Sequence, residues 1–98
     1  MSSPEDPKVE AAKQPVQMKY TFSSARKHGI KEGINAVASD ASAKTLDDWF
    51  ETVRLYKIAV KWMVAAVLLG QKEKLDDTAG QMAYLTTKAD ECLRRAEQ

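Results

Sequence analysis

Only a few side chains in this sequence are of the types that carry out acid–base, nucleophilic or metal chemistry. His28 is the single histidine, and a general base needs a nucleophile or an orienting carboxylate within hydrogen-bonding reach. Its neighbours are Arg26, Lys27 and Lys31, which supply neither. We therefore expect His28 to be a solvent-exposed side chain rather than a catalytic one.

Cys92 is the only cysteine, so the chain forms no intrachain disulfide and no zinc site built from cysteines. An isolated cysteine of this kind favours a reducing, intracellular setting. It falls at a core position of a predicted helix, where a small buried thiol is common and unreactive. We therefore expect Cys92 to be an inert part of the core.

Two pairs of adjacent carboxylates, Asp47/Asp48 and Asp76/Asp77, stand at predicted helix starts. The helix dipole stabilises negative charge there, so the pairs need no acid–base role. The sequence has no glycine-rich phosphate loop and no metal-ligand spacing. It therefore predicts a protein without catalytic residues, cofactor or metal, which indicates a binding module.

The composition of the chain argues against nucleic acid and the membrane interior as binding partners. The 98 residues suffice for one domain with a modest core. Fifteen basic and fourteen acidic residues give a net charge of +1, which lacks the positive field of a nucleic-acid-binding protein. No signal-peptide region is visible and no run approaches 18 uncharged apolar residues, so we expect no direct membrane insertion. These features predict a cytoplasmic protein.

The segment from Trp49 to Leu69 is predicted to be a central helix, against which the other elements of the chain pack. One apolar stripe follows the helical rhythm of four and three residues: Trp49, Val53, Tyr56, Val60, Met63 and Val67. A second stripe lies beside it: Leu55, Ala59, Trp62, Ala66 and Leu69. The remaining strip is polar: Glu51, Arg54, Lys57 and Lys61. An apolar surface this wide needs a neighbour on each stripe, so we expect a helix on either side.

The residue pattern before the central helix predicts a leader followed by a first helix. Residues 1–20 contain all three prolines among small, polar and charged side chains, which indicates a disordered leader. The first helix is expected to begin near 22–24 and to run to about Ser39, before a loop over 40–44. It carries three larger apolar residues (Ile30, Ile34, Val37) and a row of small ones (Ala25, Gly29, Gly33, Ala36). The small row predicts a close helix approach; the alternative is a break at His28-Gly29.

Start and stop signals bound the central helix. Thr45 can cap its start by accepting a hydrogen bond from the backbone amide of Asp48. Gly70 follows Leu69 directly and is expected to end the helix as its C-terminal cap. A short polar turn over 71–74 then forces the next helix to run antiparallel.

The third helix is expected from about Leu75 to the chain end, with Gly80 as its weak point. Its core positions follow the helical rhythm: Leu75, Ala79, Met82, Leu85, Ala89, Cys92 and Ala96. The predicted fold class is therefore all-α, an antiparallel three-helix bundle over 21–98 that follows the disordered N-terminal leader.

Two longer motifs stand out, one in the central helix and one at the chain end. The run Trp49-x-x-Thr52-x-x-Leu55-Tyr56-x-x-Ala59-Val60-x-Trp62-Met63 resembles the second helix of the microtubule-interacting and trafficking (MIT) domain family. The chain end, Leu85-x-x-Lys88-Ala89-x-x-Cys92-Leu93-x-Arg95-Ala96-Glu97, is similar to the third MIT helix with its Leu-x-Arg-Ala-Glu ending. Ala36-x-x-x-Asp40 is similar to the end of the first. Thr52 departs from the usual alanine, the loop after Asp40 is longer, and the first helix carries two glycines.

The resemblance implies a non-catalytic adaptor that binds C-terminal tail motifs of ESCRT-III subunits and recruits an attached effector to endosomal or other remodelling membranes. The implied partner is a helical tail peptide in a groove between the second and third helices. The expected peptide-binding residues are Leu93, Glu97, Asp90, Thr86, Ala89, Met63 and Val67. A partner arginine would meet Glu97 or Asp90. The alternative for Leu93 is a plain core position.

A second hypothesis is a cytoskeletal module, as on severing-type AAA ATPases. Arg54, Lys57 and Lys61 form a basic strip that could meet the acidic tails of tubulin on microtubules, although a solvated helix face explains the strip as well. A homotypic oligomer is a third reading, whereas the resemblance favours a monomer for the isolated domain.

Overall fold

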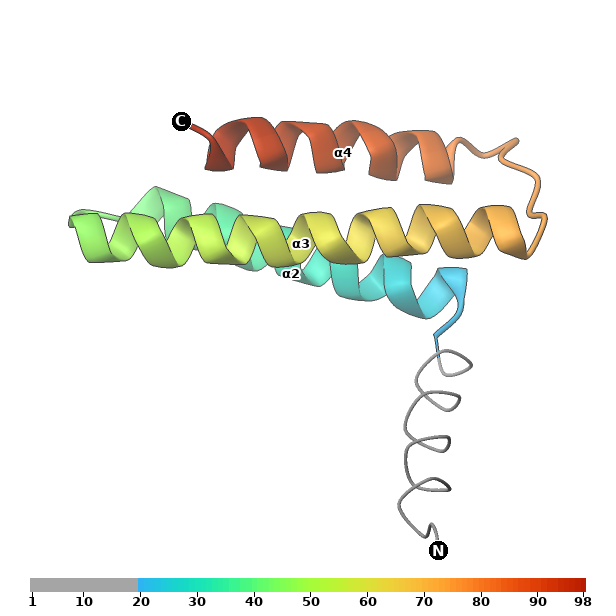
Figure 1. The fold of residues 1–98 in the computed structure, drawn as a ribbon, viewed down its shortest axis with the longest axis horizontal. Helices are drawn as coiled ribbons and strands as arrows, with labels where there is room; N and C mark the ends of the chain where they lie inside the picture. The colour runs from blue at the N-terminus through green and yellow to red at the C-terminus, as the bar shows by residue number, and fades with distance from the viewer. Residues whose placement is uncertain (1–19) are drawn as a thin grey trace, which may run out of the picture.

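The computed structural model describes residues 20–98, which form an all-α, antiparallel three-helix bundle as the sequence predicts (Figure 1). The helices are α2 (Phe22–Ser42), α3 (Leu46–Lys72) and α4 (Gln81–Ala96), and this part of the chain contains no β-strand. The leader expected over 1–20 lies outside the described residues, apart from Tyr20. None of the helices between residues 20 and 98 is long and apolar enough to cross a lipid bilayer.

α3 is the central helix, and both α2 and α4 pack along it (Figure 1). Because each of them is antiparallel to α3, α2 and α4 run parallel to each other. The expectation that the broad apolar surface of α3 needs two neighbours is confirmed. All three helices contribute buried side chains to one core: Phe22, Ala25, Ala36, Tyr56, Ala59, Met63, Ala66, Leu85, Ala89 and Cys92.

α2 is continuous through His28 and Gly29, so the alternative of a break there is wrong. The row of small residues is buried against α3, as the sequence predicts. A Cβ atom added at Gly29 would lie 2.9 Å from Met63 Cγ and 3.2 Å from the Met63 backbone nitrogen. The two backbones therefore approach closely, and the larger side chains of α2 are displaced from this contact. Ile34 and Val37 are 64% and 58% exposed.

Capping boxes begin both α2 and α3. Thr45 Oγ1 accepts a hydrogen bond from the Asp48 amide at 3.0 Å, as predicted, and the Asp48 carboxylate accepts from the Thr45 amide at 3.3 Å. Thr21 and Ser24 make the equivalent pair of bonds at the start of α2. α2 runs to Ser42 instead of ending near Ser39, so the connection to α3 is shorter than expected.

The prediction that Gly70 ends the central helix is wrong. α3 continues to Lys72, and Lys74 takes the left-handed conformation with φ 58°. The Leu75 amide donates to the Gly70 carbonyl at 3.0 Å and the Lys74 amide to the Gln71 carbonyl at 3.1 Å, which is a Schellman motif. Gly70 is instead a buried contact, because a Cβ there would lie 2.6 Å from Met82 Sδ.

The prediction that α4 begins near Leu75 is also wrong. The Asp77 carboxylate accepts hydrogen bonds from the Met82 and Ala83 amides at 2.7 and 3.1 Å, and so satisfies the first turn of a helix that starts at Gln81. Gly80, expected inside the helix, precedes it with φ 72°. Leu75 is 42% exposed and Ala79 is exposed, so the prediction that these two residues belong to the core is wrong. Leu85, Ala89 and Cys92 are buried in the core, as predicted.

Candidate functional site

A groove of about 330 Å³ runs between α3 and α4 on the side away from α2. Its lining is apolar apart from one hydroxyl and one carboxylate. The lining residues are Val60, Met63, Val64, Val67, Leu68, Leu85, Thr86, Ala89, Asp90 and Leu93. The two walls come from different helices, so the groove exists only when α4 is docked on α3.

Six of the seven predicted peptide-binding residues line this groove: Leu93, Asp90, Thr86, Ala89, Met63 and Val67. Glu97 does not, because it is the exposed residue that caps the C-terminal end of α4. Met63 and Ala89 are 3% and 7% exposed and form the floor, where they offer a ligand little surface. Leu93 is 40% exposed and offers much more.

The position of Leu93 follows from the helical repeat. Leu85, Ala89 and Cys92 turn α4 toward α3, and the next residue lies about 100° further around the helix. Leu93 therefore stands at the margin of the core, where its side chain contributes to the groove and also reaches solvent. It is not the fully covered core residue of the alternative interpretation.

Sequence reasoning missed four of the lining residues: Val60, Val64, Leu68 and Leu85. Val60 and Leu85 were counted as core. Val64 and Leu68 belong to neither of the two apolar stripes, and they are 45% and 59% exposed. Their spacing of one helical turn was the available signal, because two large apolar residues outside the core stripes mark a third apolar surface.

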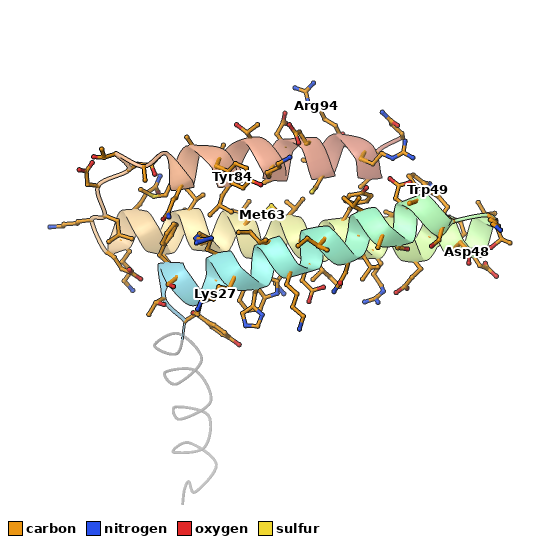
Figure 2. All side chains as sticks on the ribbon, turned by 180° about the vertical axis from the view of Figure 1, so that it is seen from behind. Lys27, Asp48, Trp49, Met63, Tyr84 and Arg94 are labelled. Carbon is orange, nitrogen blue, oxygen red and sulfur yellow. The ribbon has the colours of Figure 1, made fainter. Side chains whose placement is uncertain are left out.

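Charged side chains stand on both sides of the groove. On the α4 side, Arg94 Nε pairs with Asp90 Oδ2 at 2.9 Å, and both side chains are exposed. Figure 2 shows Arg94 on the outer side of α4, pointing away from the bundle. On the α3 side, exposed Lys57 and Lys61 fall on the same stripe as Val64 and Leu68 by the helical repeat, although they do not line the groove themselves. Arg54, the third member of the predicted basic strip, is bound by Glu51 through two hydrogen bonds of 2.9 and 2.6 Å.

A second groove, of about 380 Å³, lies between α2 and α4. Ile30, Ile34, Val37 and Tyr84 are among its lining residues, with Met63 beneath. Figure 2 shows Met63 and Tyr84 in this region between α4 and the other helices.

A polar clamp joins α2 to α4 at one end of this second groove. The Asp40 carboxylate accepts hydrogen bonds from the Tyr56 hydroxyl at 2.7 Å and from Arg95 Nε and Nη2 at 2.7 and 2.8 Å. These bonds lower the pKa of Asp40 to about 2, and burial together with the Asp40 contact raises the pKa of Tyr56 to about 12. The Arg95 guanidinium also lies 5.0 Å from the centre of the Trp49 ring.

The residues that the sequence analysis considers for catalysis make packing and capping contacts in the structure. His28 is exposed, as expected, and stacks on the Trp62 ring at 4.5 Å between ring centres. Cys92 is buried, and burial raises the pKa of its thiol, which keeps it protonated and unreactive. Asp48 and Asp77 cap helices. Residues 20–98 contain no group of three histidine, cysteine or acidic side chains that could hold a metal ion.

The two longer motifs of the sequence lie on α3 and at the end of α4, the two helices whose side chains form the groove, and the short Ala36-x-x-x-Asp40 motif lies on α2. Comparison of the chain with protein-family models, with curated proteins and with solved structures finds no match.

Proposed function

We propose that this chain is a non-catalytic adaptor module of the MIT type, which binds helical tail peptides of ESCRT-III subunits in the groove between α3 and α4. The observation that carries the proposal is the placement of Leu93. It is 40% exposed on the lining of an apolar groove, next to five of the residues that the resemblance selects.

The groove suits an amphipathic helix. Val64, Leu68 and Leu93 present exposed apolar surface from both walls, so leucines on one face of a helix would be dehydrated between them. Asp90 can accept a hydrogen bond from a ligand arginine, but only in competition with Arg94.

In this proposal the isolated domain is a monomer that works in the cytoplasm and reaches endosomal or other remodelling membranes through its partner. The domain would recruit an effector to which it is attached. The cytoskeletal alternative has less support, because the Glu51–Arg54 pair reduces the basic strip to Lys57 and Lys61.

The experiment is a titration of the labelled chain with an ESCRT-III tail peptide, followed by amide and methyl NMR shifts. We expect the largest shifts at Val64, Leu68 and Leu93. Shifts confined to Ile34 and Val37 would place the peptide in the α2–α4 groove, and no shifts at millimolar peptide would refute the proposal. Co-sedimentation with microtubules that depends on Lys57 and Lys61 would favour the cytoskeletal alternative.

A further inference from the structure

Four large apolar side chains on α3 are exposed along one face of the helix. Leu46, Phe50, Val64 and Leu68 are 67%, 60%, 45% and 59% exposed. Their successive spacings correspond to about one, four and one helical turns, so the four side chains point in similar directions. We call this set the α3 ridge. Its last two members belong to the groove with α4, whereas Leu46 and Phe50 lie outside it.

The stretch of the α3 ridge between its two ends is partly apolar and partly charged. Val53 and Val60 are half-buried beside the same face, and exposed Lys57 falls on that face by the helical repeat, so the methylene groups of its side chain offer apolar surface there. Figure 1 shows that α3 runs on past the C-terminal end of α4, so α4 covers only part of the length of α3. A ligand helix in the groove would therefore find further apolar surface if it continued toward the start of α3.

We infer that the peptide-binding surface extends along the α3 ridge from Leu68 to Leu46 and takes a single amphipathic helix of about 20 residues, with carboxylates facing Lys57 and Lys61. The inference rests on the proposed function, since it extends the same groove. The length follows from the helical rise, because the ridge spans about 33 Å at 1.5 Å per residue.

The charges along the ridge specify the ligand. Lys57 and Lys61 are exposed, and neither makes an ion pair with another residue in the described part of the chain. The opposite rim carries Asp90, which pairs with Arg94, and Glu97 stands at its end. A helix with acidic residues along one edge and a basic residue on the other would complement both rims.

A second copy of this chain fits the ridge less well. The midpoint between Leu46 and Leu68 is Lys57, so a two-fold axis that pairs the full ridge of two copies brings Lys57 close to its own equivalent. Two like charges at the centre of an apolar interface oppose association. An acidic amphipathic helix has no such conflict.

Three synthetic peptides test the inference by isothermal titration calorimetry. The short peptide has 12 residues, with leucines at helical spacing and one arginine on the edge. The long peptide adds ten residues that continue the leucine pattern and place glutamates on the opposite edge. A third peptide carries the same ten added residues in scrambled order, which keeps composition but removes the apolar face. We expect the long peptide to bind about tenfold more tightly than the short and scrambled ones, from the added apolar contact.

Variants of the protein locate the added contact. Phe50→Ser should remove the advantage of the long peptide and leave binding of the short peptide within about twofold, because Phe50 lies outside the groove. The double variant Lys57→Glu/Lys61→Glu should weaken binding of the long peptide, whose glutamates face these lysines, more than binding of the short one. Ile34→Ser is the matched control, because Ile34 is equally exposed but lines the other groove. Circular dichroism verifies that each variant is folded.

The outcomes separate the two proposals. If the short peptide binds but the long one gains nothing, or its gain survives Phe50→Ser, the extended surface is refuted while the groove stands. If neither peptide binds, the proposed function fails and the extension fails with it. A doubled mass in light scattering that Phe50→Ser abolishes would assign the ridge to a second copy instead.

Discussion

Substitution of Leu93 by aspartate should abolish peptide binding without unfolding the domain. Leu93 is 40% exposed, so the new carboxylate can reach water in the free protein. The loss of its buried apolar part costs about 1–2 kcal/mol of unfolding free energy. In the complex, a leucine-rich helix would have to dehydrate the carboxylate, at a cost of about 2–4 kcal/mol, or roughly 30- to 1,000-fold in Kd.

Leu85→Asp and Met63→Asp provide the contrast. Leu85 is fully buried and Met63 is 3% exposed, so a carboxylate at either position has no route to solvent. An unpaired buried charge costs about 3–5 kcal/mol or more. That is a large share of the stability of about 5–10 kcal/mol expected for a domain of this size, so both variants should be largely unfolded or strongly destabilised.

The measurements are helical circular dichroism, thermal melting and titration with an ESCRT-III tail peptide on all three variants and the parent chain. If Leu93→Asp melts as early as the two core variants, Leu93 is structural and the site assignment is wrong. If the variant folds and still binds with unchanged Kd, the peptide lies elsewhere on the bundle.

Four further substitutions test the polar clamp, the contact between α2 and α3, and the turn after α3. Asp40→Asn should lower the stability at neutral pH by about 1–2 kcal/mol, because a carboxylate that accepts three hydrogen bonds becomes a neutral amide. Since the pKa of Asp40 is lowered from 3.8 to about 2, its contribution is complete above the unfolded value and is lost as pH falls from about 4 to 2, so urea unfolding curves of parent and variant should converge there. Gly29→Ala should destabilise by about 1–3 kcal/mol because its Cβ meets Met63 backbone, whereas Gly33→Ala meets only the flexible Met63 Cε at 3.1 Å and should be near neutral; equal melting temperatures for the two variants would contradict the close approach. Lys74→Gly should stabilise by about 1 kcal/mol, because glycine adopts the left-handed conformation without the steric cost, and a lower melting temperature would argue against that conformation.

The sequence predicts those features of the fold that local patterns determine. The cap at Thr45 depends on two residues one turn apart, and the burial of α3 depends on a repeat that runs the length of the helix. The small row on α2 is equally local, since it needs only side chains that allow two backbones to approach. These features were therefore predicted without knowledge of the partner helix.

The errors at both ends of the connection between α3 and α4 have one cause. Glycine is used for left-handed turns and for close contacts, and sequence alone does not separate these uses. Gly70 is buried because Phe22 and Met82 converge on it, which depends on residues far along the chain. The start of α4 depends on the Asp77 carboxylate, which accepts hydrogen bonds from backbone amides beyond Gly80. Apolar spacing alone does not reveal this cap, because Leu75 and Ala79 continue the helical repeat of α4 toward the N-terminus.

The candidate groove was predictable on its α4 side and less so on its α3 side. Leu93 and Thr86 follow from the position of the α4 core, one step around the helix. Val64 and Leu68 were not predicted as site residues, because the two apolar stripes already account for the packing of α3 against two helices. A bundle of three helices needs no third apolar surface on its central helix. Glu97 does not line the groove, because α4 ends at Ala96 and Glu97 is its C-terminal cap.

The three helices are held in place unequally, and this has a dynamic consequence. α2 meets α3 through small residues with the backbones in near contact, whereas α4 buries only Leu85, Ala89 and Cys92 and depends on Arg95 for its link to α2. Local opening should therefore begin with α4, while the hairpin of α2 and α3 persists. Because one wall of the groove belongs to α4, a bound peptide stabilises the docked state and slows amide exchange along that helix. The ligand would thus determine how long the third helix of its own receptor stays in place.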